Sequence, residues 1–129
     1  MSEFSKALSV SASGLNAQSS RIRHLSENIS NADTPGYRRK TIPFETAMGA
    51  EGVAKVEAGR VRLDRTELER VYDPSHPMSD DTGHYDGSNV NLLIELADAR
   101  EAQRSYQANL KMFEQARSMS SSLMQLLRR

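Results

Sequence analysis

Residues 26–38, SENISNADTPGYR, join the end of a helical repeat to a strong turn signal. A proline and a glycine end the helix and turn the chain. Two asparagines before them can bond exposed backbone or a neighbouring chain, and the tyrosine that follows can anchor the turn by packing. These residues are Asn28, Asn31, Pro35, Gly36 and Tyr37. From the residues alone, an ordinary helix C-terminus explains this stretch better than any special site.

Upstream of the turn, apolar and small residues recur at alternating steps of four and three positions, which is the period of a helical seam. The pattern predicts one helix from about Glu3 to Ala32, roughly 45 Å long. Gly14 and many serines lower its intrinsic helix propensity, so this helix should need a partner helix. Its packing residues are expected to be Leu15, Ile22, Leu25 and Ile29.

The same period returns downstream and predicts a second helix from about Asn89 to Leu127, roughly 58 Å long, with Ser88 or Asn89 as its cap. Its seam residues are expected to be Leu96, Tyr106, Leu110, Phe113 and Leu127. A second apolar stripe should stay exposed unless neighbouring molecules cover it, and it comprises Leu93, Ala102, Met112, Ala116, Met119, Leu123 and Leu126. Exposed apolar surface along a rod indicates lateral assembly.

Between the helices the pattern changes to short β-like runs separated by loop residues. Residues 53–57 and 59–64 are predicted to form two strands around a Gly turn, and residues 69–72 a third strand. The chain then divides into an N-terminal helical part over 1–36, a small β-rich or loop part over 37–87 and a C-terminal helical part over 88–129. The predicted fold is mainly α: an antiparallel coiled coil of long N- and C-terminal helices with a small β-rich insert.

Composition narrows the classes of partner. The 17 basic and 17 acidic residues balance, so nothing electrostatic favours nucleic acid or an anionic membrane as the main partner. The chain has no cysteine, which excludes disulfides, thiolate zinc sites and cysteine nucleophiles. No apolar run approaches the ~18 residues of a membrane span, so an integral membrane protein is not expected. The first residues also lack the basic and apolar regions of a cleaved secretory signal.

Catalysis and metal binding are not expected. His24 lies on the polar side of the first predicted helix, and His76 and His84 lie in a loop with several aspartates. Those aspartates sit among turn residues, where local hydrogen bonding favours them, so a solvated loop without metal or cofactor is expected. A small hydrolase using His76 or His84 would have the needed residue types, but no nucleophile elbow or Gly-rich oxyanion turn is visible.

The basic run at residues 38–40, RRK, is too short for a nucleic-acid interface. A solvated turn, or a contact to an acidic neighbour, is the better interpretation.

Several segments together resemble a known family. SASGLNAQ (11–18) with ENISNADTPGYRRK (27–40) is similar to the N-terminal signature of flagellar basal-body rod and hook proteins. Residues 88–119, SNVNLLIELADAREAQRSYQANLKMFEQARSM, resemble the C-terminal helix of that family. Residues 71–91, VYDPSHPMSDDTGHYDGSNVN, resemble the loop before that helix in one of the two short proximal rod subunits. The sequence departs from the common pattern of the family at Ser26, Glu27 and Ser30, and in a shorter loop before Tyr37.

The resemblance implies a structural subunit of the proximal rod and no enzyme. It implies export through the flagellar type III apparatus without a cleaved signal, and assembly in the periplasm-spanning rod of the basal body. That rod transmits torque and encloses the export channel. The implied partners are further copies of the chain, other rod subunits, basal-body ring or adaptor proteins, and the export apparatus. Two alternatives stay open at this point: the other proximal rod subunit, and a soluble two-helix adaptor that binds one partner helix.

Overall fold

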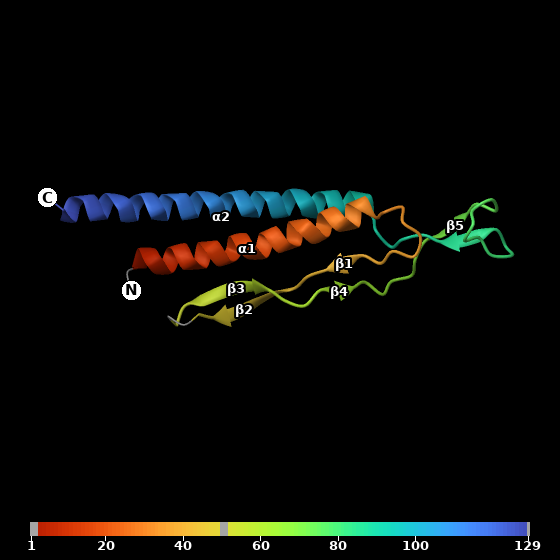
Figure 1. Cartoon of the computed structure of the whole chain (residues 1–129), viewed down its shortest axis with the longest axis horizontal. Coiled ribbons are helices and arrows are strands. Elements are labelled where there is room, and N and C mark those ends of the chain that lie inside the picture. Colours follow the sequence, from red (N-terminus) through yellow and green to blue (C-terminus); the bar gives the residue numbers. More distant parts are fainter. Residues whose placement is uncertain (1–2, 50–51, 129) are drawn as a thin grey trace.

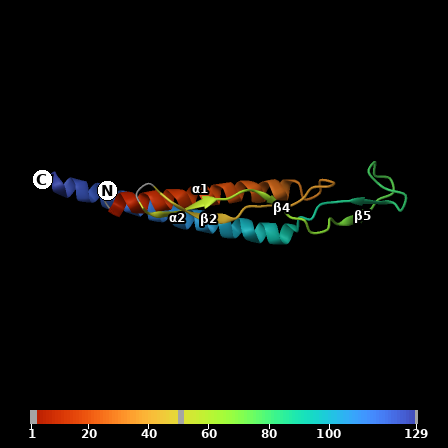
Figure 2. The ribbon, with the colours of Figure 1, turned by 90° about the horizontal axis from the view of Figure 1, so that it is seen from below.

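The computed structural model, which describes residues 3–49 and 52–128, is an elongated hairpin of two long helices with short strand pairs between them (Figure 1). Helix α1 spans Glu3–Ser30 and helix α2 spans Leu92–Leu127. The two helices run antiparallel, and α1 lies along α2 in both side views (Figure 2). The predicted mainly helical fold with two long terminal helices is therefore confirmed.

The two helices meet through small and polar side chains. Ala17 and Ala102 are 2% and 0% exposed, and a Cβ added at Gly14 would lie only 3.0 Å from the side-chain nitrogen of Asn109. Small residues at such positions let the two backbones approach closely. The two largest fully buried side chains are polar, Asn28 and Glu95. The interface within the chain is therefore not the continuous apolar seam of a coiled coil.

The predicted seam of α2 differs from the face that α2 turns toward α1. Tyr106 and Phe113 are half-buried, as expected of seam residues. Leu96, Leu110 and Leu127 are instead 50%, 36% and 73% exposed in the single chain. The other residues on the α2 face toward α1 each lie one position before a residue of the predicted repeat, and they are Glu95, Ala102, Asn109 and Ala116. Because α1 presents small residues, α2 matches it with small and polar ones and leaves its leucines outside.

Because α2 turns a different face toward α1, the prediction for the second apolar stripe is also partly wrong. Ala102 is buried and Ala116 is half-buried, whereas both were expected to be exposed. The larger members of that stripe are exposed as predicted, at Leu93, Met112, Met119, Leu123 and Leu126. On α1, Leu25 is buried, and Leu15, Ile22 and Ile29 are half-buried.

Helix α2 extends past the beginning of α1. Its 36 residues exceed the 28 of α1 by eight, which corresponds to about 12 Å of helix. Figures 1 and 2 show the C-terminal end of α2 projecting beyond the N-terminal end of α1. We call the last turns of α2, residues 120–127, the overhang. Its large apolar residues Leu123, Met124, Leu126 and Leu127 are 45–73% exposed.

The cap of α2 is Asn91, not Ser88 or Asn89. The Asn91 side-chain oxygen accepts hydrogen bonds from the backbone N–H groups of Leu93 (3.0 Å) and Ile94 (3.5 Å). Ser88 and Asn89 make tertiary hydrogen bonds instead, so their side chains serve the junction described below.

The middle of the chain runs away from the turn along two strands and returns along two others, each of which pairs with one of the first two. Strand β2 (Phe44–Met48) pairs with β3 (Ala54–Ala58), and β1 (Lys40–Thr41) pairs with β4 (Arg62–Leu63), both antiparallel. The predicted pairing around Gly59 is therefore wrong, because the two strands that flank Gly59 pair with earlier strands. The Gly59 N–H accordingly donates to the carbonyl of Pro43 at 2.8 Å.

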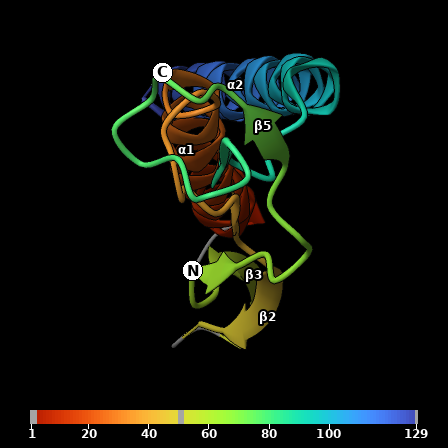
Figure 3. The same cartoon turned by 90° about the vertical axis from the view of Figure 1, so that its right-hand side faces the viewer.

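A third pair joins β5 (Arg70–Tyr72) to β6 (His84–Asp86), and β5 confirms the strand predicted over 69–72. Viewed end-on, α1 lies between α2 and the β2–β3 pair (Figure 3). The β5–β6 hairpin projects past the end of the helices where α2 begins. The molecule thus has a helical body with a side layer and a projecting tip.

Candidate functional site: a polar junction and an exposed helical face

A buried asparagine organises the junction between the end of α1 and the start of α2. Asn28 is 0% exposed and uses its full hydrogen-bonding capacity. Its oxygen accepts from the Tyr37 hydroxyl at 2.8 Å and from the Lys40 N–H at 2.9 Å. Its nitrogen donates to the Lys40 carbonyl at 2.8 Å and to the Glu95 carboxylate at 3.4 Å. Asn28 therefore holds the chain after the turn against both helices.

A buried ion pair completes this junction. Glu95 is fully buried in the first turns of α2, and one of its oxygens accepts from Nε of Arg39. Arg39 also reaches Asp98 at 3.2 Å and Asp64 at 3.9 Å. A buried carboxylate is stable only when paired and hydrogen-bonded, so Arg39 is the group that allows Glu95 to stay in the core.

Asn89 and Ser88 tie the remaining strands into the same place. The Asn89 oxygen accepts from the Arg39 N–H at 2.6 Å, and its nitrogen donates to the Asp64 carbonyl at 2.9 Å. The Ser88 hydroxyl donates to the Ala32 carbonyl. Three parts of the sequence thus meet at one point: residues 28–40, Asp64 and residues 88–98. We call this set of contacts the polar junction.

The predicted turn residues lie at this junction. Asn31 donates to the Glu27 carbonyl at 2.8 Å and accepts from the Thr34 hydroxyl at 3.0 Å. Gly36 has φ of 76°, in the left-handed region that favours glycine, and its N–H reaches the Gly87 carbonyl at 3.0 Å. The half-buried Pro35 precedes it. Burial raises the pKa of the Tyr37 hydroxyl, which keeps that hydroxyl protonated and able to donate to Asn28.

The basic run at residues 38–40 contacts carboxylates of its own chain. Arg39 pairs with Glu95, and the Lys40 ammonium lies 2.5 Å from Glu27. This bond lowers the pKa of Glu27 and raises that of Lys40. Two residues of this run therefore contact acidic side chains, as one of the two interpretations of the sequence predicted.

Sequence reasoning missed three members of the polar junction. Arg39, Glu95 and Asn89 were not singled out as a site. One signal was available: Glu95 interrupts the apolar run LLIELA at residues 92–97, where a buried acid demands a partner.

The histidines of the loop stabilise the β5–β6 hairpin. The His76 ring stacks on Tyr85 at 3.9 Å between centroids, and its Nδ1 accepts from the Met78 N–H at 3.1 Å. His84 lies 5.1 Å from the Tyr72 ring. Within residues 3–49 and 52–128, no group of three or more His, Cys, Asp or Glu is placed to hold a metal ion.

One carboxylate of the same hairpin, that of Asp80, has a strongly lowered pKa. Hydrogen bonds from the Thr82 hydroxyl, the Arg70 guanidinium and the His84 N–H hold the pKa of Asp80 well below its ordinary value of 3.8. The ionised form therefore stabilises the hairpin fully above the unfolded-state pKa. That stabilisation is lost as the pH falls below 3.8 and then through the folded-state pKa.

We expect the side-chain carboxyl carbon of Asp80 to keep its NMR shift from pH 7 down to about 4 and to change only at lower pH. In Asp80→Asn this change should disappear, because the titrating carboxylate is gone. A midpoint at the ordinary Asp pKa in the unmodified chain would contradict the hydrogen-bonded state of Asp80.

Most of the exposed large apolar residues lie on α2. Only Glu95 and Ala102 of this helix are buried, and its exposed large apolar residues lie in its first turns and again from Leu110 to its end. They are Leu92, Leu93, Ile94, Leu96, Leu110, Met112, Met119, Leu123, Met124, Leu126 and Leu127. Neither helix formed by the described residues is apolar enough over a sufficient length to cross a bilayer. We call the exposed leucine, isoleucine and methionine residues of α2 named above the apolar face of α2.

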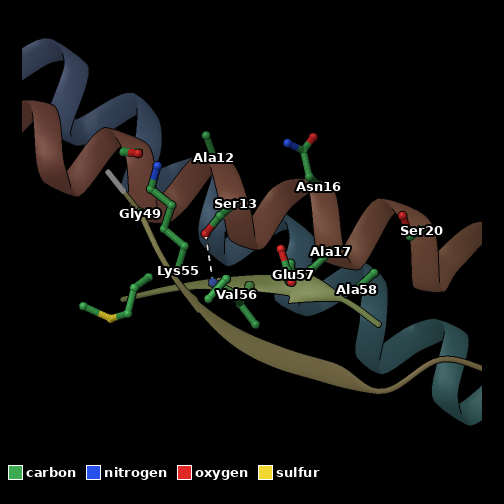
Figure 4. Close-up of a pocket in the computed structure, with 13 residues that line it drawn as sticks. Ala12, Ser13, Asn16, Ala17, Ser20, Gly49, Lys55, Val56, Glu57 and Ala58 are labelled. Atoms are coloured by element: carbon green, nitrogen blue, oxygen red, sulfur yellow. Dashed lines mark hydrogen bonds between the residues drawn. The ribbon is translucent and has the colours of Figure 1, made fainter. Parts of the chain in front are cut away.

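A shallow groove of about 540 Å³ separates α1 from the β2–β3 pair (Figure 4). Small residues line most of it, including Ala12, Ser20 and Ala58. Ser13 bridges it, because its hydroxyl accepts a hydrogen bond from the Val56 N–H at 3.3 Å. The groove seats the side layer on α1 and carries no arrangement of acid, base and nucleophile among its lining residues.

Comparison with known proteins agrees with this architecture. The family model described as "Flagella basal body rod protein" matches residues 8–38, which hold most of α1 and the turn. The model described as "Flagellar basal body rod FlgEFG protein C-terminal" matches residues 82–126, which hold α2 and the segment before it. The matched segments contain Asn28 and Glu95, so both sides of the polar junction fall within them.

Relatives that align over most of the chain show which kind of rod protein it resembles. The flagellar basal-body rod protein FlgC of Agrobacterium fabrum is 43% identical over 136 aligned residues, covering 99% of this chain and 98% of the relative. FlgC of Borreliella burgdorferi is 31% identical over 94% of this chain and 95% of its own length. FlgC of Salmonella typhimurium is 30% identical over 85% and 87%.

The two long helices and these matches define a structural protein of the flagellar rod and not an enzyme. The chain belongs to the FlgC family of flagellar basal-body rod proteins. The resemblance inferred from residues 11–40 and 71–119 is therefore confirmed, and the loop at 71–91 indicated the correct rod subunit. A rod protein of this family is located in the flagellar basal body.

Proposed function

We propose that the chain polymerises through its two helices into the proximal part of the rod, where it transmits motor torque and encloses the export channel. The observation that carries this proposal is the apolar face of α2. A helix of 36 residues with only two of them buried leaves more apolar surface exposed than an isolated monomer should carry. Side-by-side packing of identical or related helical hairpins would cover it.

Within this assembly each part of the chain has its own task. Residues 1–36 and 88–129 form the core of the rod, and residues 37–87 lie further out and contact neighbouring subunits. The predicted assembly residues Leu96, Leu110 and Leu127 are available for this, because α1 does not cover them. Leu15, Ile22, Leu25, Ile29, Tyr106 and Phe113 support the hairpin from within. The polar junction holds the turn residues 28–37 at one end.

Torque transmission requires many contacts in parallel rather than one strong interface. Each subunit is held on several sides, so individual interfaces can be modest. The rigid junction at Asn28 and Glu95 fixes the angle between helical body and insert, which lets load pass from one to the other. The further partners in this proposal are other rod subunits, ring or adaptor proteins of the basal body and the export apparatus that delivers the chain.

The proposal is tested in cells that lack the gene and carry a tagged copy of it. We expect the tagged chain to restore swimming and to co-purify with basal bodies, and an electron-microscopy map to place its two helices side by side within the rod. Swimming without any chain in purified basal bodies would contradict the proposal. A soluble adaptor would instead stay a folded monomer or dimer at every concentration.

A further inference from the structure

A basic and apolar groove lies over β4, away from the helical interface. It has a volume of about 820 Å³, and its lining residues are Arg38, Val61, Arg62, Leu63 and Arg65. Val61 and Leu63 are 38% and 53% exposed. Among the described residues, no carboxylate lies within 4.0 Å of the Arg62 or Arg65 guanidinium. We call this surface the arginine groove.

The remaining arginine of the groove is also not neutralised by a direct ion pair. Arg38 donates to the backbone carbonyls of Asp64 (3.4 Å) and Thr66 (3.0 Å). The Asp64 carboxylate accepts from the Thr66 N–H at 2.9 Å and lies near Arg39. The groove therefore presents the charges of Arg62 and Arg65, which no carboxylate of the described residues pairs with, beside exposed valine and leucine. It fits a partner that is both acidic and apolar.

The projecting tip of the same molecule has that chemistry. Residues 67–86 contain six carboxylates and a single arginine, Arg70, which pairs with Asp80 (2.7 Å) and Asp86 (3.0 Å). Glu69 and Asp81 are exposed and have no ion pair among the described residues. Tyr72 and Met78 add exposed apolar surface at 66% and 63%.

One molecule cannot bring its own tip onto its own groove without refolding. The β5–β6 tip points away from the body beyond the end of the helices, whereas β4 lies beside β1, along the helical body (Figure 1). The two surfaces are also different from each other, so their contact between molecules is heterologous. A heterologous contact that does not close on itself builds an open helical assembly, which is the geometry of a rod.

We propose that the acidic tip, residues 67–86, docks into the arginine groove of a second copy of this chain. The inference rests on the proposed function, because it names one contact within the polymer. Exposed Tyr72 and Met78 would cover Val61 and Leu63, while the free carboxylates face Arg62 and Arg65. Complementary charge at such a rim fixes orientation and register more than it adds affinity.

A charge exchange tests this contact. Arg62→Glu with Arg65→Glu gives an acidic groove, and Glu69→Lys with Asp81→Lys gives a basic tip. We expect each double variant alone to enter basal bodies about tenfold less than the unmodified chain. Expressed together they should recover, because each tip then meets a groove of opposite charge on the other variant. Failure to recover, with both variants folded by circular dichroism, would overturn the proposal.

The absence of cysteine allows a direct check by cross-linking within purified basal bodies. Copies with Met78→Cys and copies with Leu63→Cys, expressed together, should form dimers with a bismaleimide. The pair Met78→Cys and Gln125→Cys is the matched control and should not. A chain that is present in basal bodies but joins only to a different protein, or to nothing, overturns the docking and leaves the rod function intact. A chain absent from basal bodies overturns the rod function itself.

Discussion

Replacing Arg39 with Leu should lower the free energy of unfolding by about 3 kcal/mol, a large fraction of the total for a chain of this size. Glu95 is 0% exposed and depends on the Arg39 guanidinium for its counter-charge. Without it, the carboxylate is left buried with no counter-charge, which costs free energy. The figure stands at the low end of the usual range because the Arg39 side chain is 23% exposed. Urea denaturation followed by circular dichroism measures it.

The matched control removes both partners. Arg39→Leu combined with Glu95→Leu eliminates the buried charge together with its counter-charge, so most of the lost stability should return. A double variant as unstable as Arg39→Leu alone would show that the lost stability belongs to the contacts of Arg39 with Asp98 and Asp64, or of Glu95 with Asn28, and not to the Arg39–Glu95 pair. An Arg39→Leu protein with unchanged stability would contradict the buried ion pair altogether.

The helices and the turn between them could be predicted because their signals are local. The alternation of four and three steps specifies helix over α1 and α2 whatever each helix packs against. Pro35 and Gly36 end the first helix through their own backbone preferences. The strand at residues 70–72 was predicted for the same kind of reason, since its β-favouring residues stand between turn residues.

The face of each helix was harder to predict, because it depends on the partner. Leu96 and Leu110 have the same helical spacing as Glu95 and Asn109. Spacing therefore does not distinguish the two faces, and hydrophobicity alone favours the leucines. The choice is made by α1, whose Gly14 and Ala17 leave room only for small or hydrogen-bonded side chains. A seam predicted from one helix in isolation therefore missed the correct face by one residue.

Strand pairing and the polar junction depend on contacts across long sequence separations. Phe44–Met48 has no clear alternation, and it forms a strand because Ala54–Ala58 returns beside it. Asn28 and Glu95 are 67 positions apart, and their meeting follows only once both helices are aligned. Recognition of the signature around Asn28 pointed to this region, but the identity of its partners required the fold.

The overhang of α2 is the place where a single charge should do most harm to assembly. Leu126 is 62% exposed in the single chain, so Leu126→Asp should change the free energy of unfolding by less than about 0.5 kcal/mol. In the rod, we expect neighbouring subunits to bury this residue. An unpaired carboxylate there costs several kcal/mol at each repeated contact, roughly enough to exclude the subunit. We expect swimming to be abolished and the chain to be missing from purified basal bodies.

Gln125→Asp is the matched control, because it places the same charge at the same helix end. Both variants therefore carry the same unfavourable interaction with the helix dipole. Gln125 lines a hollow with the charged residues Glu114 and Arg117, whereas Leu126 lines another with Phe4, Met119 and Leu123; Ser118 and Ser122 border both. If only Leu126→Asp stops swimming, the apolar side of the overhang is the contact surface. Equal loss in both would assign the effect to charge at the helix end, and normal swimming of Leu126→Asp would remove the overhang from the assembly interface.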